Sequence, residues 1–443
     1  MKLFQTQSRR LIESTGLYAG LVALALVLVT GCTPAPTSLG DEALKRGDYA
    51  AAKAAYEEQL QKNPDNTRVK AALGRAQYNL NEYDAAIATL EPIHRHDPGN
   101  ATAALYLGLS HEAKDDIPAA EAAYERYLTT DSKSDMARHL RGRLIYLRDN
   151  TIRSQAKEAV KLESTMKLDT TGPMVVAVLP FTVSGPGSDS LEALGKGMAA
   201  AISYDLFQVK SIKVVERLRL NSIFEEIALA DSGITDPKSS PRVGRLVGAN
   251  QLVNSGLKFL PNHDVSIQSG VIRTRDAAYK PALLTENQFE RLWQVQKDIT
   301  FAVIDQLGIL LTPEERNAIE KIPTRNVEAF MAYSRGIESM DRGDYEEANA
   351  QFQQAAKLDP GFEQAKAMQS ESSAALEGSA PAAQFESTLA TGLPGTGAGP
   401  GLAGPPPMDL INSISRPSTD PRTDDAPGGG AGTGTANVGG SIP

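Results

Sequence analysis

The residue types that most often carry catalysis or bind metals are few in this 443-residue chain and do not cluster. Five histidines are present: His94, His96, His111, His139 and His263. His94 and His96 are two residues apart, so on a helix they would point to different faces and could not hold one metal ion together. We therefore interpret the histidines as packing or solvated side chains and predict no metal site.

A glycine-rich stretch at 185–190 raises the question of a nucleotide site. It follows an expected strand and opens an expected helix, but Ser190 replaces the third glycine of the dinucleotide-binding pattern. Gly195 and Lys196 lack the glycine five positions earlier that a phosphate-binding loop requires. The sequence therefore predicts no catalytic residue and no cofactor, and the chain is not expected to be an enzyme.

Cys32 is the only cysteine, and it ends a segment typical of exported bacterial lipoproteins. A basic start is followed by an apolar stretch at 17–29, which is shorter than the roughly 20 residues of a membrane-spanning helix. The ending Val29-Thr30-Gly31-Cys32 resembles the lipobox, in which the cysteine is lipidated and becomes the mature N-terminus. The alternative is a plain secretory signal with a chance cysteine. In the Gram-negative sorting pattern, Thr33 rather than Asp after the cysteine implies the periplasmic face of the outer membrane.

The charge of the chain argues against nucleic acid as a partner. The formal net charge is −9, and removal of residues 1–31, which hold three basic residues and one acidic residue, would leave about −11. Nucleic-acid binding requires dense positive charge instead. Hydrophobic residues make up 41% of the chain, which is enough for packed cores in two or three domains.

A 34-residue period follows the anchor segment. Leu-Gly pairs recur at 39–40, 73–74 and 107–108, and Arg141-Gly142 keeps the register. Other positions share it: Tyr49, Tyr83 and Ile117; Ala52, Ala86 and Ala120; Tyr56, Leu90 and Tyr124; Pro64 and Pro98. This is the signature of the tetratricopeptide repeat (TPR), in which small residues let two helices approach and large residues fill the layer between them. We expect residues 135–165 to be a closing helix pair, and one further repeat around Gly336 and Phe352 to pack on another domain.

The first helix of each TPR repeat lines the concave face, which usually binds peptides or proteins. In this register the predicted groove residues are Arg68, Arg75, Tyr78, Asn79, Arg143 and Tyr146. Arginine and tyrosine together favour an acidic or C-terminal peptide segment as the ligand. For any one of these residues, a solvated surface position is the alternative interpretation.

Strands appear from Met174 to about Leu311. The apolar run 175–180 is typical of a buried central strand, and helical stripes alternate with further strand patterns after it. The expected elements are strands at 175–180 and 212–215, helices at 191–206, 220–227 and 243–247, a hairpin at 252–259 and 265–272, and a helix from Thr285 through Leu307 opened by a cap with Gln288. Such alternation predicts an α/β domain with helices covering a sheet.

This region resembles the curli-assembly CsgG family. The resemblance lies in an ordered set of motifs at 214–217, 232–236, 243–250 and 253–256, and the opening at 175–180 is shared with the TolB amino-terminal domain. It covers about 140 residues and implies the periplasmic fold of that family and self-association into a homo-oligomer. Pore-forming members carry two long hairpin inserts, whereas here we expect one hairpin and a stretch at 273–285 too short for a second.

The sequence thus predicts an α+β multidomain protein that works by binding other proteins. The expected parts are a signal peptide (1–31), a lipid-anchored linker (32–37), an all-α TPR solenoid (38–165), a CsgG/TolB-like α/β domain (174–311), a helical segment with one TPR hairpin (312–376) and a disordered Gly/Pro-rich tail (378–443). The favoured function is a scaffold for periplasmic or outer-membrane proteins in envelope secretion or curli-like assembly. The alternative is an oligomeric CsgG-like outer-membrane secretion channel.

Overall fold

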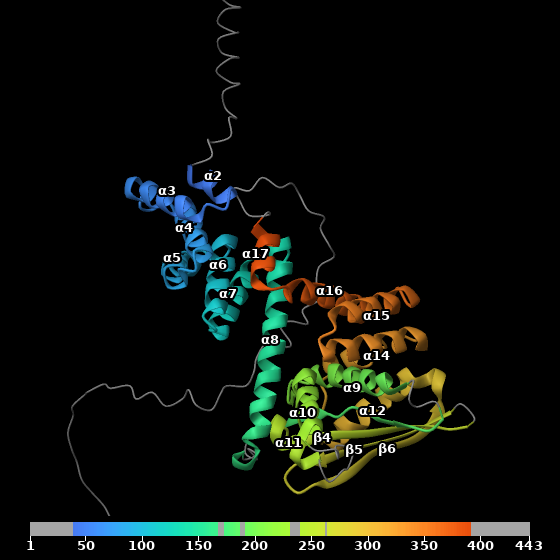
Figure 1. Ribbon diagram of the computed structural model, residues 1–443. Helices are drawn as coiled ribbons and strands as arrows, with labels where there is room; N and C mark the ends of the chain where they lie inside the picture. Colours follow the sequence, from blue (N-terminus) through green and yellow to red (C-terminus); the bar gives the residue numbers. More distant parts are fainter. Residues whose placement is uncertain (1–38, 167–171, 187–190, 231–239, 262–263, 391–443) are drawn as a thin grey trace, which may run out of the picture. The chain divides into compact units, whose positions relative to one another are not determined.

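The structure, a computed structural model, describes residues 39–166, 172–186, 191–230, 240–261 and 264–390 (Figure 1). These residues form two compact units. The first, called here the repeat unit, takes 39–155, 342–350 and 368–390 of the described residues. The second, the sheet unit, takes the described residues of 156–341 and 351–367.

The repeat unit begins with antiparallel helix pairs. The helices are α2 (Leu39–Lys45), α3 (Tyr49–Lys62), α4 (Thr67–Asn79), α5 (Tyr83–His96), α6 (Ala101–Ala113), α7 (Ile117–Thr130) and α8 (Asp135–Lys161). Asn66 and Asn100 cap α4 and α6, because each side chain accepts a hydrogen bond from a backbone N–H three residues later. The recurring asparagine therefore starts the first helix of these repeats.

The glycines of the 34-residue period lie where the paired helices approach most closely. A Cβ on Gly74 would meet the Leu90 side chain at 2.4 Å, and one on Gly108 would meet the Tyr124 ring at 2.1 Å. Leu90 and Tyr124 are fully buried. The predicted exchange of small and large residues across each pair is confirmed.

Helix α8 corrects one expectation. Residues 135–165 do not form a helix pair, because α8 continues without a break from Asp135 to Lys161 and is followed only by a short 3-10 turn, η2 (Glu163–Thr165). After Gly142 the sequence of α8 has no glycine or proline that would end a helix. The closing unit is thus one long helix.

The repeat unit also receives the end of the described chain. Helix α16 (Glu363–Gly378) is followed by α17 (Ala382–Ala390). The expectation of a structureless tail from 378 was therefore wrong for 382–390, because Phe385 and Leu389 are buried in the same apolar cluster as Tyr106 and Leu140. Residues 391–443, to which the rest of that expectation applies, lie outside the described residues.

The sheet unit contains a mixed sheet of six strands in the described residues. They are β1 (Val175–Val178), β2 (Thr182–Ser184), β3 (Lys213–Val214), β4 (Gln251–Phe259), β5 (Asp264–Arg273) and β6 (Ala278–Gln288). The order is β3-β1-β4-β5-β6, with β2 also paired to β4. Pairs β1–β3, β1–β4 and β2–β4 are parallel, whereas β4–β5 and β5–β6 are antiparallel.

Helices cover both faces of this sheet, since its apolar residues fall into two separate clusters, each packed with a different pair of helices. They are α9 (Glu192–Phe207), α10 (Arg217–Ala230), α11 (Ser240–Val247) and, after the short turn η5 (Phe289–Arg291), α12 (Leu292–Gln306). Val176 and Val178 of β1 pack with α9 and α12, whereas Ala177 packs with α10 and α11. The alternation along β1 places apolar residues on both faces, which is why the strand reads as a continuous apolar run.

Strand β6 corrects two further expectations. Residues 285–288 belong to this strand and do not open a helix, which begins only at Leu292. The stretch after Arg273 also holds a second hairpin, since β6 pairs with β5 from Asp264↔Gln288 to Arg273↔Ala278. A local capping pattern stabilises a helix by only about 1 kcal/mol, whereas pairing along the whole of β5 satisfies the backbone of the segment.

The downstream repeat lies after helix α13 (Pro313–Ile319). It consists of α14 (Val327–Arg342) and α15 (Tyr345–Leu358). A Cβ on Gly336 would meet the Phe352 ring at 2.6 Å, as in the earlier repeats. Helix α14 packs on α9, where Gly197 faces Ser334 and the Lys196 ammonium lies 2.9 Å from the Glu338 carboxylate. The repeat was expected to pack on another domain; residues 327–341 of α14 instead pack on α9 within the same compact unit.

Other sequence features have simple structural counterparts. Gly185, with φ of +100°, is required because a Cβ there would lie 2.3 Å from the Phe259 carbonyl oxygen. Residues 187–190 of the glycine-rich stretch lie outside the described residues.

Within the described ranges, no helix combines the length and apolar composition of a membrane crossing. Across the same residues, no three His, Cys, Asp or Glu side chains converge as metal ligands would.

Candidate protein-binding groove

The first helices of successive pairs, α4, α6 and α8, form the inner surface of the repeat unit. We call this surface the repeat groove and define it by Arg75, Tyr78, Tyr106, Arg143 and Tyr146. The Tyr78 and Tyr106 ring centroids are 5.5 Å apart, and the Arg75 guanidinium lies over the Tyr106 ring at 5.5 Å. The groove therefore combines aromatic surface with two cations.

Helix α17 occupies one part of the repeat groove. Its buried residues are Phe385, Glu386 and Leu389, and Ala382 on the same stripe is half-buried. Residues 383, 384, 387 and 388 are exposed. This spacing is that of an amphipathic helix, whose one narrow face packs against the repeats. Figure 1 shows α17 beside α8 and α6.

Glu386 places a carboxylate inside the groove. Its side chain is only 11% exposed and lies 3.7 Å from the Arg75 guanidinium. The Tyr106 hydroxyl donates a hydrogen bond to the same carboxylate. Burial raises the pKa of Tyr106 well above its usual value, so this hydroxyl keeps its proton at neutral pH and remains a donor.

Arg143 joins the groove to the segment that carries α17. Its guanidinium donates to both Glu112 carboxylate oxygens at 2.5–3.1 Å, and to the carbonyls of Gly378 at 2.8 Å and Ala380 at 2.7 Å. The same group lies 5.3 Å from the centre of the Phe385 ring. Burial opposes the charge of Arg143, but the hydrogen bonds and charge of Glu112 outweigh it and raise the pKa of the guanidinium.

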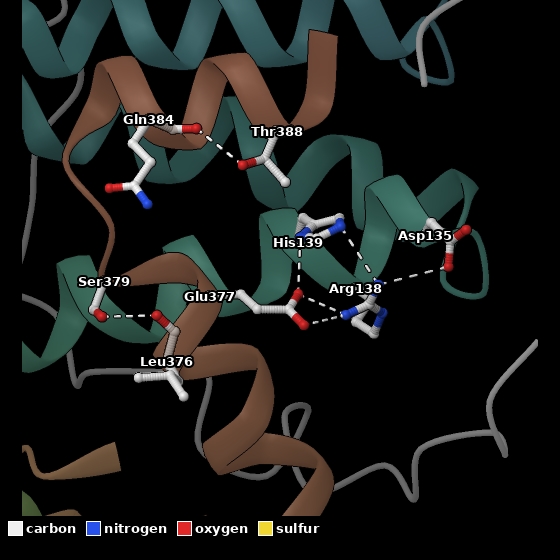
Figure 2. A network of polar contacts seen from close by, with 8 residues as sticks. All are labelled: Asp135, Arg138, His139, Leu376, Glu377, Ser379, Gln384 and Thr388. Atoms are coloured by element: carbon white, nitrogen blue, oxygen red, sulfur yellow. Dashed lines mark hydrogen bonds and ion pairs between the residues drawn. The ribbon is translucent and has the colours of Figure 1, made fainter. Parts of the chain in front are cut away.

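A second polar contact fixes α16 on α8, as Figure 2 shows. Arg138 donates to both carboxylate oxygens of Glu377 at 2.5 and 2.6 Å, and His139 lies 2.9 Å from one of them. Although burial opposes it, the hydrogen bonds from His139 and Arg138 keep the pKa of Glu377 below its usual value. Arg138 and His139 therefore hold the end of α16 on α8. The two carbonyls that Arg143 binds, of Gly378 and Ala380, lie at this end and just after it.

A cavity of about 480 Å³ adjoins the occupied part of the groove. It is lined by Asp41, Leu44, Lys45, Tyr56, Thr67, Arg68, Ala71, Ala72, Arg75, Asp97, Gly99, Asn100, Ala101 and Thr102. Lys45 and Arg68 are exposed, so the cavity opens to solvent. Arg75 lines the cavity and also contacts Glu386. It therefore belongs both to the cavity and to the part of the groove that α17 occupies.

Comparison with known families agrees with this architecture. Two tetratricopeptide repeat models match residues 43–95 and 71–135, and the model of the curli production assembly/transport component CsgG matches residues 156–270. The chain is a TPR protein with a CsgG-like domain. No curated protein matches it.

Two solved structures are similar to this TPR protein at low identity. A tetratricopeptide repeat protein from Parabacteroides merdae shares 13% identity, with 75% of this chain and 96% of that chain covered and a TM-score of 0.24. Yeast Tom70 shares 11% identity, with 79% of this chain and 68% of that chain covered and a TM-score of 0.24.

The six predicted groove residues have different surroundings in the TPR protein. Tyr78 and Tyr146 are half-buried, and burial raises the pKa of Tyr78 to about 12. Arg75 and Arg143 face the chain's own C-terminal segment. Arg68 lies at the cavity and pairs with Asp41 at 2.8 Å, whereas the Asn79 amide donates to the Arg75 carbonyl of its own helix. Three of the six, Arg68, Arg75 and Arg143, therefore lie at the cavity or against the C-terminal segment.

The groove also contains residues that the repeat register did not indicate. Tyr106 and Glu112 come from α6, and Phe385 and Glu386 from α17. A signal was present, because Phe385 and Leu389 are spaced by four residues, as on one face of a helix. Cys32, the predicted lipidation site, lies outside the described residues.

Proposed function

We propose that this TPR protein is an outer-membrane-anchored periplasmic lipoprotein that acts as a protein–protein interaction scaffold in envelope secretion or curli-like surface assembly. The TPR repeats support a protein partner, and the CsgG-like domain supports the curli-related or secretion setting. The proposed location at the outer membrane rests on the lipobox-like ending at Cys32. Periplasmic or outer-membrane proteins are the corresponding partners.

The observation that carries the scaffold role is the cavity at the open part of the groove. Lys45, Arg68 and Arg75 contribute three positive charges to its lining, against two from Asp41 and Asp97. Among the described residues, the buried Nε–H of Arg75 finds no acceptor. A buried donor without a partner costs about 1–3 kcal/mol, so a ligand that brings a carboxylate oxygen there gains affinity. The partner segment is therefore acidic or ends in a C-terminal carboxylate.

The test is capture of the partner by crosslinking in the native envelope. Replacing Lys45 and Arg68 together by Glu turns attraction at the cavity into repulsion. We expect the crosslinked partner to fall about tenfold, which corresponds to about 1.4 kcal/mol. Both residues are exposed, but Arg68 also pairs with Asp41 at 2.8 Å, so circular dichroism and the melting temperature check that the variant keeps its fold.

A matched control makes the same change of charge away from the groove. Lys62 and Arg95 are exposed, lie on the second helices of their repeats, and each pairs with a glutamate one turn away. We expect the variant in which both residues are replaced by Glu to capture as much crosslinked partner as the unmodified protein. Equal capture by the cavity variant and the unmodified protein would remove the cavity from the binding site.

Transport is the second candidate function, and the CsgG match favours it, because that family's description names a transport component. The two candidates differ in what the pure protein does. A scaffold captures its partner and leaves a planar bilayer without conductance, whereas a secretion channel conducts ions reproducibly.

A further inference from the structure

The strongest unexplained feature is the way α17 fills the repeat groove. The helix has nine residues, and a short connection at 379–381 separates it from α16. It presents an aromatic, an acidic and an aliphatic side chain at successive positions i, i+1 and i+4: Phe385, Glu386 and Leu389. Each finds a matching surface in the groove, so α17 lies there as a ligand helix would.

Glu386 of α17 leaves one hydrogen-bond donor of the groove, in Arg75, without an acceptor among the described residues. The Glu386 carboxylate lies 3.7 Å from Arg75 Nη2, beyond hydrogen-bond distance, and Arg75 Nε has no acceptor among the described residues. Arg75 also lines the neighbouring cavity, which α17 does not line. A longer ligand has room to occupy both the cavity and the part of the groove where α17 now lies.

Helix α17 is also short for a stable helix. Isolated helices below about 12–15 residues are marginal in water, so the nine residues of α17 depend on the groove for their order. Pro381 comes directly before the helix and interrupts its connection to α16. Release of α17 from the groove therefore leaves α16 and its Arg138–Glu377 contact in place.

We propose that α17 is an internal competitor for the TPR groove, and that the external partner binds with an amphipathic helix carrying an aromatic, an acidic and an aliphatic residue at i, i+1 and i+4. The inference rests on the proposed scaffold function and specifies its ligand. The partner helix displaces α17, pairs its carboxylate with Arg75 and extends into the cavity toward Lys45 and Arg68. Partner binding is consequently weaker than the groove alone would allow, because α17 is present at an effective concentration of about millimolar.

The experiment measures binding of a labelled peptide with the sequence of residues 379–390 to the full chain by fluorescence anisotropy. One chain is unmodified, and the other carries Phe385→Ala and Leu389→Ala, which remove the apolar contacts of its own α17. We expect the peptide to bind the variant chain at least about tenfold more tightly. A control chain with Gln384→Ala and Ser387→Ala, on the exposed face of α17, binds it as the unmodified chain does.

The outcomes separate this inference from the scaffold function. Equal peptide affinity for the unmodified and variant chains, or no binding to either, overturns the inference. A dimer of the unmodified chain that becomes monomeric in the variant also overturns it, because the groove would then hold a second copy's helix. If the cavity variant loses the envelope partner while the Phe385/Leu389 variant captures no more than the unmodified chain, the scaffold function stands and the competitor role fails.

A milder variant covers the case in which the double substitution disturbs the fold. Glu386→Gln keeps the shape of the side chain and removes its charge opposite Arg75. We expect faster hydrogen exchange in residues 382–390 and peptide affinity between those of the unmodified and double-variant chains. Unchanged exchange and unchanged affinity contradict the proposal.

Discussion

At the scale of single residues, Arg143 does most to order the groove. Its guanidinium binds one carboxylate and two carbonyl groups and lies against two aromatic rings, those of Tyr146 and Phe385. The side chains of Arg143 and Glu112 are 6% and 7% exposed. Because water cannot replace either partner, the two charges depend on each other.

Replacement of Arg143 by Met should therefore be strongly destabilising. It leaves the Glu112 carboxylate buried without its cation, and breaking a buried pair in this way costs about 3–5 kcal/mol. Urea unfolding of the full chain measures the loss. The double variant Arg143→Met with Glu112→Gln should recover part of it, since the uncompensated charge is gone. A loss below about 1 kcal/mol in the single variant would contradict this account.

His94 gives the repeat unit a dependence on pH. It is buried, and burial together with the charge of Arg126 lowers its pKa below the usual 6.5. As pH falls below about 6.5, the unfolded chain binds a proton at this residue before the folded chain does. The contribution of His94 is therefore constant above that pH and becomes increasingly destabilising below it.

The corresponding experiment compares melting temperatures at pH 7.5 and 5.5. The drop between the two should be smaller in His94→Leu than in the unmodified protein, because that variant has no proton to bind at this position. His96 is exposed two residues later, and His96→Leu should keep the full drop. An identical drop in all three proteins would show that His94 does not contribute.

At the scale of elements, the crossing of α8 and α16 positions α17. A Cβ on Gly142 would lie 1.9 Å from the Ala374 carbonyl oxygen, and one on Gly378 would lie 2.0 Å from the Gly142 carbonyl carbon. The two helices thus touch backbone to backbone. This approach brings the Gly378 and Ala380 carbonyls within reach of Arg143.

Gly142→Ala should loosen α17 by displacing α16. The neighbour of the new methyl group is backbone and cannot rotate away, and overpacking of this kind costs about 1–3 kcal/mol. Hydrogen-exchange mass spectrometry should show faster exchange in 382–390, about tenfold for each 1.4 kcal/mol. Asn150→Ala, at an exposed position of α8, is the control. Unchanged exchange in α17 would mean that the crossing does not hold it.

Elements set by neighbouring residues were predictable, whereas those set by distant residues were not. The repeat helices follow from small and large residues that meet within one 34-residue unit, such as Gly108 and Tyr124. The seat of α17 depends on Tyr106 and Glu386, which are 280 positions apart. Residues 382–390 contain no glycine or proline, but Gly and Pro lie close on both sides of them, and these flanks hide the two apolar residues that decide the outcome.

The strand at 278–288 was missed for a related reason. Thr285 and Gln288 have the spacing of a helix cap, but the partner strand β5 decides the structure of this segment. At the candidate site, the repeat register was sufficient to place Arg75, Tyr78 and Arg143 on the first helices of their repeats. It could not reveal that α17 of the same chain packs against these residues.

At the scale of the whole molecule, the proposed location at the outer membrane decides where the groove can bind a partner. The lipobox-like ending at Cys32 predicts an acylated N-terminus, and several acyl chains on one residue hold firmly where a single chain binds only marginally. The TPR groove would then act close to the membrane surface.

Cys32→Ala should therefore abolish incorporation of a radioactive fatty acid and move the protein from the membrane to the soluble fraction. Thr33→Ala, next to the modified position, is the control and should keep the label. The same amount of label in the Cys32 variant and the unmodified protein would exclude lipidation at this residue.

The contact between Tyr106 and Glu386 also fixes an order of events during biosynthesis. A ribosome makes the chain from its N-terminus, so the repeat helices emerge long before residue 386 exists. Until then, the aromatic surface around Tyr106 is uncovered and open to chaperones. A chain that terminates before α17 never covers it, which would mark truncated products for degradation. Pulse-chase turnover of chains ending at 378 and at 390 would show the difference as a shorter half-life of the first.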